Sequence, residues 1–140
     1  TYEQVCGGKT GHAEIIQIAF DADETSFEEL LLIFLKTHDP TTLNRQGADV
    51  GTQYRSVVFY ESENQRNVTL EMIKQLNEQE IFSSPIVTEV AAVEVFYPAE
   101  KYHQDYYINN RYQGYCMAVI APKLAKFAEN FRDKIKPELL

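Results

Sequence analysis

The chain has 140 residues, a length that suits one compact domain with a single core. Its hydrophobic fraction of 44% and charged fraction of 24% are those of an ordinary soluble globular protein, which excludes the disordered and membrane-embedded classes. Thirteen Lys and Arg stand against 21 Asp and Glu, and the formal charge of -8 repels phosphate backbones and anionic lipids. We therefore expect neither a nucleic acid nor a membrane as a partner.

Location and redox context follow from the same composition. No apolar run approaches the roughly 18 residues of a membrane-spanning helix, and the first residues lack the basic-then-apolar order of a secretion signal. By default we expect a cytoplasmic protein, with an organellar matrix as the alternative location. Two cysteines, Cys6 and Cys116, are too few for the disulfide framework of a small secreted domain. Any chemistry that they perform is therefore redox or nucleophilic.

The first part of the chain is expected to form a strand, a helix and a long loop. Residues 13–20 are rich in β-branched side chains, a pattern that predicts a strand. Ser26 followed by Glu29 is a capping-box pattern, and apolar residues at helical spacing predict a helix that ends ahead of Pro40. Residues 39–53 then form a loop of about 15 residues, a length that favours a functional loop.

The rest of the chain continues the alternation. We expect strands at residues 54–60 and 88–96, an amphipathic helix at 62–77, a short helix at 99–108 and a final helix at 123–134. Strands and helices that interleave in this way favour an α/β (α+β) two-layer sandwich.

The expected fold has a ferredoxin-like core, a mixed sheet with helices, in one domain that spans residues 1–140. A chain that opens with a loop and then a core strand leaves one edge of that sheet without a partner. We therefore expect that the first strand and helix of the fold are missing from these residues.

A glycine-rich segment, residues 7–14, leads to Glu14 at the start of the first predicted strand. The P-loop spacing is absent and the net charge is negative, so phosphate binding is disfavoured. A carboxyl group flanked by Ala13 and Ile15 that loses solvation is favoured in its protonated form and can donate a proton near neutral pH. The alternative is a solvated strand-end glutamate, which the spacing alone favours.

The region from His38 to Ser56 concentrates hydrogen-bonding side chains and glycines, as binding loops on rigid scaffolds do. A metal site is disfavoured because no pair of candidate ligands has the spacing typical of metal sites; the candidates are His12, His38, His103, Asp39, Asp49 and Asp105. His38 can instead cap the C-terminal end of its helix.

A third cluster, residues 96–107, combines four tyrosines with Lys, His, Gln and Asp and indicates a polar, aromatic-lined site. Gly114 follows it, and Cys116 lies just beyond in a short loop before the last helix, so its thiol has the freedom that an exchange reaction needs. A buried, inert thiol is the equally supported alternative.

Long strings of this sequence resemble the A-type peptide methionine sulfoxide reductases. The strings are Thr-Tyr-Glu-Gln-Val-Cys at 1–6, Gly-His-Ala-Glu at 11–14, the run from His38 to Ser56, Tyr-Pro-Ala-Glu-Lys-Tyr-His-Gln-Asp-Tyr at 97–106, and Gly-Tyr-Cys at 114–116. The resemblance covers essentially the whole chain. It implies reduction of the S-epimer of methionine sulfoxide, free or in proteins, to methionine, without a cofactor.

The resemblance also implies roles for individual residues. In this family a thiolate attacks the sulfoxide sulfur while a glutamate, here Glu14, protonates the departing oxygen. The matching substrate-site residues are Tyr2, Tyr54, Asp49 and His103. The attacking cysteine becomes a sulfenic acid, and a resolving cysteine, matched by Cys116, condenses with it to a disulfide that thioredoxin or dithiothreitol reduces.

The sequence departs from the family at the nucleophile. The family carries it in a Gly-Cys-Phe-Trp string at a helix N-terminus, where the helix dipole favours a thiolate. This chain has no such string and no Trp, and Cys6 is not its match. Three hypotheses follow: a reductase whose N-terminal segment lies outside these residues, a catalytically inactive module that binds methionine sulfoxide, and, ranked last, an enzyme that uses Cys6.

Overall fold

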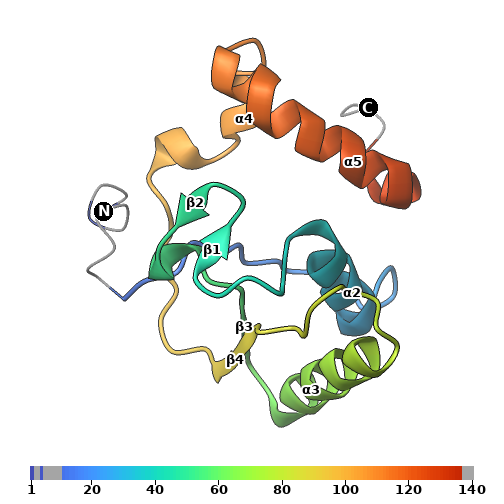
Figure 1. Ribbon diagram of the computed structural model, residues 1–140. Coiled ribbons are helices and arrows are strands. Elements are labelled where there is room, and N and C mark those ends of the chain that lie inside the picture. Colours follow the sequence, from blue (N-terminus) through green and yellow to red (C-terminus); the bar gives the residue numbers. More distant parts are fainter. Residues whose placement is uncertain (2–3, 5–10, 137–140) are drawn as a thin grey trace. The chain divides into compact units, whose positions relative to one another are not determined.

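The computed structural model describes residues 1, 4 and 11–136, so Tyr2 and Cys6 lie outside the described residues (Figure 1). The chain forms two compact units, residues 1–97 and residues 98–140, and each unit is considered by itself below. The predicted site residues divide between them. Glu14, Asp49 and Tyr54 belong to the first unit, and His103 and Cys116 belong to the second.

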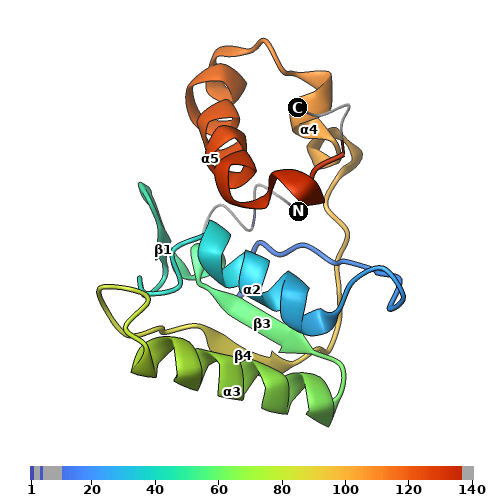
Figure 2. The same ribbon diagram turned by 90° about the vertical axis from the view of Figure 1, so that its right-hand side faces the viewer.

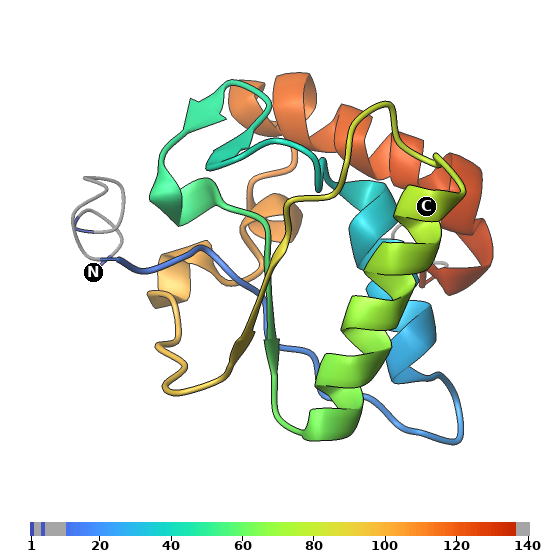
Figure 3. The ribbon, with the colours of Figure 1, turned by 60° about the horizontal axis from the view of Figure 1, so that its bottom comes forward.

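The centre of the first unit is a β-α-β arrangement. Strand β3 (Val57–Tyr60) pairs in parallel with β4 (Glu89–Ala92), with Val57 opposite Glu89 and Tyr60 opposite Ala92. Parallel neighbours need a crossover connection, and helix α3 (Glu63–Glu78) supplies it (Figure 3). Backbone bonds from Glu89 N to Ser56 O and from Val93 N to Tyr60 O extend the ladder beyond both strand ends.

Helix α2 (Phe27–Thr37) lies near strand β3 (Figure 2). It shares a hydrophobic core with α3. Leu31 and Leu35 of α2 and Leu76 of α3 are buried, and Val58 of β3 is among the apolar residues that pack against them. The spacing of Leu31 and Leu35 places both side chains on one face of α2, so burial of that face fixes the helix against the β-α-β arrangement.

The loop between α2 and β3 contains a small hairpin. Strand β1 (Arg45–Gln46) pairs antiparallel with β2 (Asp49–Val50), and a 3-10 turn, η1 (Thr52–Tyr54), leads from it to β3. Gly51 joins β2 to η1 with φ 147°, a backbone conformation that is essentially restricted to glycine.

The second unit is helical in the residues that the structure describes. It consists of η2 (Lys101–His103), α4 (Tyr106–Asn109), one π-helical turn η3 (Cys116–Ile120), α5 (Ala121–Phe131) and η4 (Arg132–Lys134). Cys116 is the one buried residue among residues 98–136. No helix in either described unit is long and apolar enough to span a membrane.

The predicted α/β class is confirmed, since parallel β3 and β4 are joined by a helix and packed against a second one. The helices predicted at 62–77 and before Pro40 form as α3 and α2. The predicted strands at 54–60 and 88–96 are shortened to β3 and β4, because Thr52–Tyr54 forms the turn η1 and the described ladder ends at Val93.

Two local predictions were wrong. Residues 13–20 form no strand, because a strand requires a hydrogen-bonded ladder to a neighbouring strand. Glu14 N donates one bond to Gln53 O, and Ile16 is 78% exposed. The helix predicted at 99–108 is broken into η2 and α4, because Asp105 adopts a left-handed conformation with φ 54° between them.

Candidate functional site

Glu14 lies beside the turn that carries Tyr54. Its backbone nitrogen donates a hydrogen bond to Gln53 O at 2.8 Å, so residues 11–14 run alongside η1. The sequence left open whether Glu14 is desolvated or solvated. In the part of the chain that the structure describes, its side chain is exposed, as the alternative reading of a solvated glutamate expects.

Asp49 and Tyr54 are held by the hairpin and by Gly51. Gly51 N donates to Asn44 O at 2.8 Å, and Tyr54 N donates to Gly51 O at 3.0 Å, so β1, β2 and η1 form one hydrogen-bonded loop. Asp49 is exposed on β2 and Tyr54 is half-buried at the end of η1. The structure therefore brings Glu14 and Tyr54 together on adjacent backbone segments, with Asp49 on the loop that leads to them.

His38 belongs to a chain of hydrogen-bonded polar groups that includes the buried Ser56. Its Nδ1 lies 2.5 Å from Phe34 O, and its Nε2 lies 2.6 Å from Ser56 Oγ, which in turn lies 2.8 Å from Thr88 Oγ1. Burial lowers the pKa of His38 from its ordinary value, against the opposing effects of the Phe34 carbonyl and of the Asp39 charge. The predicted capping of α2 by His38 is confirmed.

Asp39 follows the C-cap residue His38 and begins the loop after α2. Thr41 Oγ1 donates to Asp39 Oδ1 at 2.5 Å and Thr41 N donates to the same oxygen at 2.9 Å. These two bonds lower the pKa of Asp39, and the bond from the Thr41 hydroxyl group has the larger effect. Among the described residues no group of three or more His, Cys, Asp or Glu side chains is placed to hold a metal ion.

A shallow pocket of about 270 Å³ opens between the hairpin loop and β4. Its lining residues are Thr42, Leu43, Asn44, Arg55, Ser56, Val87 and Glu89. Neither Glu14 nor Tyr54 lines it, so the pocket does not coincide with the predicted site, although Arg55 follows Tyr54 directly in the chain.

The second unit holds the other two predicted residues. His103 is half-buried at the end of η2, with its ring centroid 4.7 Å from that of Tyr102. Cys116 is a free thiol with 0% exposure at the first position of η3. Of the two readings that the sequence left open, the structure supports the buried thiol, because the π-helical turn packs the side chain inward where a loop was expected.

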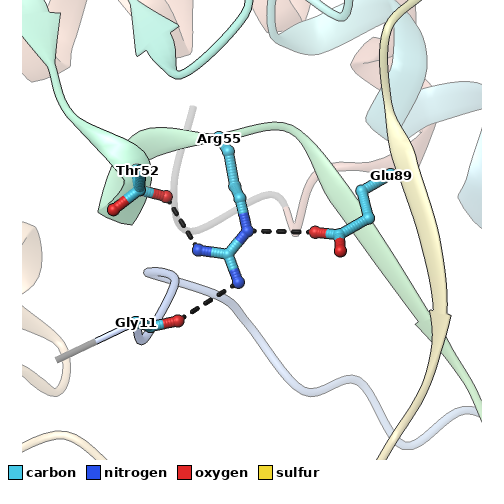
Figure 4. A network of polar contacts seen from close by, with 4 residues as sticks. All are labelled: Gly11, Thr52, Arg55 and Glu89. Carbon is cyan, nitrogen blue, oxygen red and sulfur yellow. Dashed lines mark hydrogen bonds and ion pairs between the residues drawn. The ribbon is translucent and has the colours of Figure 1, made fainter.

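Sequence reasoning assigned no role to Arg55, although the structure places it at the junction of three segments. Its guanidinium group contacts Gly11, Thr52 and Glu89 (Figure 4). The available signal was an arginine between the polar loop and an apolar strand, where a charged side chain needs partners. The sequence also contained no sign that Ser56 is buried. Its hydroxyl group contacts His38 and Thr88, which lie in distant parts of the sequence.

Comparisons with known proteins agree on one family. The family model described as peptide methionine sulfoxide reductase matches residues 1–135. A relative in Deinococcus radiodurans named peptide methionine sulfoxide reductase MsrA is 53% identical over 135 residues, which is 96% of this chain and 66% of the relative. An MsrA of Saccharolobus solfataricus is 52% identical over 136 residues, covering 97% of this chain and 76% of its own length.

Solved structures give the same result. Reduced Mxr1 from Saccharomyces cerevisiae superposes with a TM-score of 0.77 at 35% identity, covering 83% of this chain and 63% of its own. Methionine sulfoxide reductase A of Corynebacterium diphtheriae gives a TM-score of 0.67 at 30% identity, with 81% and 58% covered. The chain thus spans 66% of the Deinococcus relative and a similar share of these structures.

Proposed function

Because this chain belongs to the peptide methionine sulfoxide reductase family, we propose that the whole protein reduces the S-epimer of methionine sulfoxide, free or in proteins, to methionine. The observation that carries the proposal within the chain is the bond from Glu14 N to Gln53 O. It keeps a carboxyl group next to the Tyr54 turn, and an acid beside a hydroxyl donor is what a departing sulfoxide oxygen requires.

In the proposed reaction Glu14 gives a proton to the sulfoxide oxygen. Its exposed position leaves room for a substrate, and an apolar methionine side chain that covers the carboxyl group desolvates it and favours its protonated form. Hydroxyl groups of Tyr54 and Tyr2 then hydrogen-bond the same oxygen, and Asp49 orders the water around it. The family resemblance also assigns a substrate-binding role to His103.

The remaining chemistry is a two-electron exchange between two sulfur atoms. A cysteine thiolate attacks the sulfoxide sulfur, the oxygen passes to the cysteine as a sulfenic acid, and methionine is released. The sequence contains no Gly-Cys-Phe-Trp string. We therefore assign the attacking thiolate to a part of the whole protein that is not among these 140 residues.

Cys116 completes the proposed cycle as the resolving residue. Its thiol condenses with the sulfenic acid, one water molecule leaves, and the resulting disulfide is reduced by thioredoxin or by dithiothreitol. Because Cys116 is fully buried, η3 has to open before this step. A thioredoxin partner places the reaction in a reducing compartment, and the cytoplasm is the location that we propose.

The decisive experiment measures methionine release from the separated S-epimer and R-epimer with dithiothreitol. The whole protein, its Glu14→Gln variant and the 140-residue chain are compared. We expect turnover of the S-epimer by the whole protein alone and a loss of about 10²-fold or more in kcat for Glu14→Gln. Absence of S-epimer turnover by the whole protein contradicts the proposal.

One alternative keeps support from the sequence, because the chain lacks the Gly-Cys-Phe-Trp string. A catalytically inactive module binds methionine sulfoxide and releases it unchanged. Calorimetric titration of the whole protein with the S-epimer distinguishes the two functions, since the module shows saturable binding without methionine release. Turnover by the 140-residue chain that disappears in Cys6→Ser instead identifies Cys6 as the nucleophile.

A further inference from the structure

We propose that Arg55 is a positioning residue that holds the Glu14 segment against the Tyr54 turn, a role that rests on the proposed function of Glu14 as the acid. Arg55 is the first residue after η1 and lies immediately before the buried Ser56. It is therefore anchored at the rigid start of the β-α-β arrangement, while its side chain reaches the segment that carries Glu14.

The guanidinium group makes one bond to each of three segments. Nε donates to Glu89 Oε2 at 3.0 Å on β4, and Nη1 donates to Thr52 O at 2.8 Å in η1. Nη2 donates to Gly11 O at 3.3 Å, three residues before Glu14. Figure 4 shows the group between these partners, with one nitrogen pointing toward each.

Two bonds at separate points hold residues 11–14 more firmly than one. The bond from Arg55 to Gly11 O lies at the start of this segment, and the bond from Glu14 N to Gln53 O lies at its end. Gly11 has φ 75°, and nothing lies within 4 Å of the position that a Cβ would take. Because glycine has no side chain, contacts of its backbone hold it in place. Loss of the Arg55 bond therefore removes the tie at Gly11, while the bond of Glu14 N and the stack of His12 on Tyr97, with ring centroids 5.0 Å apart, remain.

The arrangement depends on the shape of the guanidinium group as well as on its charge. The Arg55 side chain is 23% exposed, and its ion pair with Glu89 neutralises the charge beside the pocket. A lysine at this position keeps a positive charge near Glu89. Its single ammonium nitrogen cannot replace the three nitrogens of the planar guanidinium group, which bond three acceptors in different directions. Arg55→Lys thus separates geometry from charge.

The kinetic experiment uses the whole protein and the S-epimer. We expect Arg55→Lys to lower kcat by roughly ten- to a hundredfold, because a misplaced acid costs rate while substrate binding is untouched, so KM stays within about twofold. Glu89→Gln removes the ion pair with Arg55 but keeps an acceptor oxygen, so we expect it to lower kcat by less than Arg55→Lys does. The matched control is Arg66→Lys, whose arginine makes an exposed pair with Glu63 on α3 at 3.9 Å.

A second measurement does not depend on activity. Amide hydrogen exchange at Glu14 in the whole protein reports the bond to Gln53 O directly, and we expect it to accelerate in Arg55→Lys and not in Arg66→Lys. If the wild-type protein shows no turnover, the proposed acid role of Glu14 is contradicted. Amide exchange at Glu14 still decides whether Arg55 holds residues 11–14. An unchanged kcat in an active enzyme, a rise in KM alone, or unchanged exchange at Glu14 overturns the positioning role.

Discussion

His38 illustrates how a single residue connects distant parts of the first unit. Its Nδ1 faces the Phe34 carbonyl, which only a protonated nitrogen can satisfy, so Nε2 of the neutral ring is the acceptor for Ser56. The ring also stacks on Phe34 with centroids 3.9 Å apart. The neutral ring therefore satisfies both contacts, and a proton on Nε2 forces the Ser56 hydroxyl to reverse.

This arrangement predicts a pH-dependent stability. Because burial lowers the pKa of His38 in the folded state, the unfolded chain binds the proton first as the pH falls. The contribution of His38 to the free energy of unfolding is therefore present above about pH 6.5 and is lost progressively below it. Urea unfolding of the chain at pH 8 and pH 5.5 is expected to show a smaller pH effect in His38→Asn. Equal pH effects in both proteins contradict the prediction.

Gly51 gives a second prediction at the residue scale. A Cβ added here meets Gln53 Oε1 at 2.2 Å, in addition to the backbone strain at φ 147°. Gly47 in the hairpin turn has φ 58° and open space around it, so Gly47→Ala suffers backbone strain alone. We expect Gly51→Ala to lower the free energy of unfolding by about 1–3 kcal/mol more than Gly47→Ala, as measured by urea denaturation. A larger loss in Gly47→Ala argues against this account.

At the scale of elements, the start of α2 was predictable because capping is local. Ser26 Oγ accepts from Glu29 N at 3.1 Å, as the capping box requires, whereas the Glu29 carboxylate accepts from Thr25 Oγ1 at 2.7 Å. Local patterns likewise located α3 and the parallel strands. The stretch at 13–20 has the composition of a strand but lacks a ladder, and composition carries no information about a neighbour.

The cap of α2 can be measured. Ser26→Ala removes the acceptor for Glu29 N, and we expect it to lower the free energy of unfolding by about 1 kcal/mol, while Ser26→Gly loses only a few tenths. Thermal unfolding monitored by circular dichroism gives both values. If the two variants are equally destabilised, the loss stems from packing and not from the cap.

At the scale of the whole molecule, the two units differ in how they are stabilised. The first has a buried leucine cluster between two helices, whereas residues 98–136 bury one side chain in the described structure, that of Cys116. Elements with little buried apolar surface open at low free energy. The second unit is therefore expected to open locally far more often than the first.

Cys116 provides the test of this difference. In a Cys6→Ser background, a thiol reagent reacts with Cys116 only when η3 opens, because the side chain is 0% exposed. We expect labelling well before global unfolding, with a rate that stays unchanged in Ser26→Ala, since that cap stabilises only the first unit. If the rate of Cys116 labelling changes in parallel with global unfolding, local opening of η3 is contradicted.

The sequence by itself determined the family, the α/β class and the two main helices, with the caps of α2, and its resemblance to the family supplied the residues that are proposed as acid and hydrogen-bond donors. These depend on short-range patterns and on strings read directly from the chain. Only the tertiary structure decided that residues 13–20 form no strand, that Cys116 is buried, and that Arg55 bonds Gly11, Thr52 and Glu89 together. Each depends on contacts between segments distant in the chain, which local periodicity does not encode.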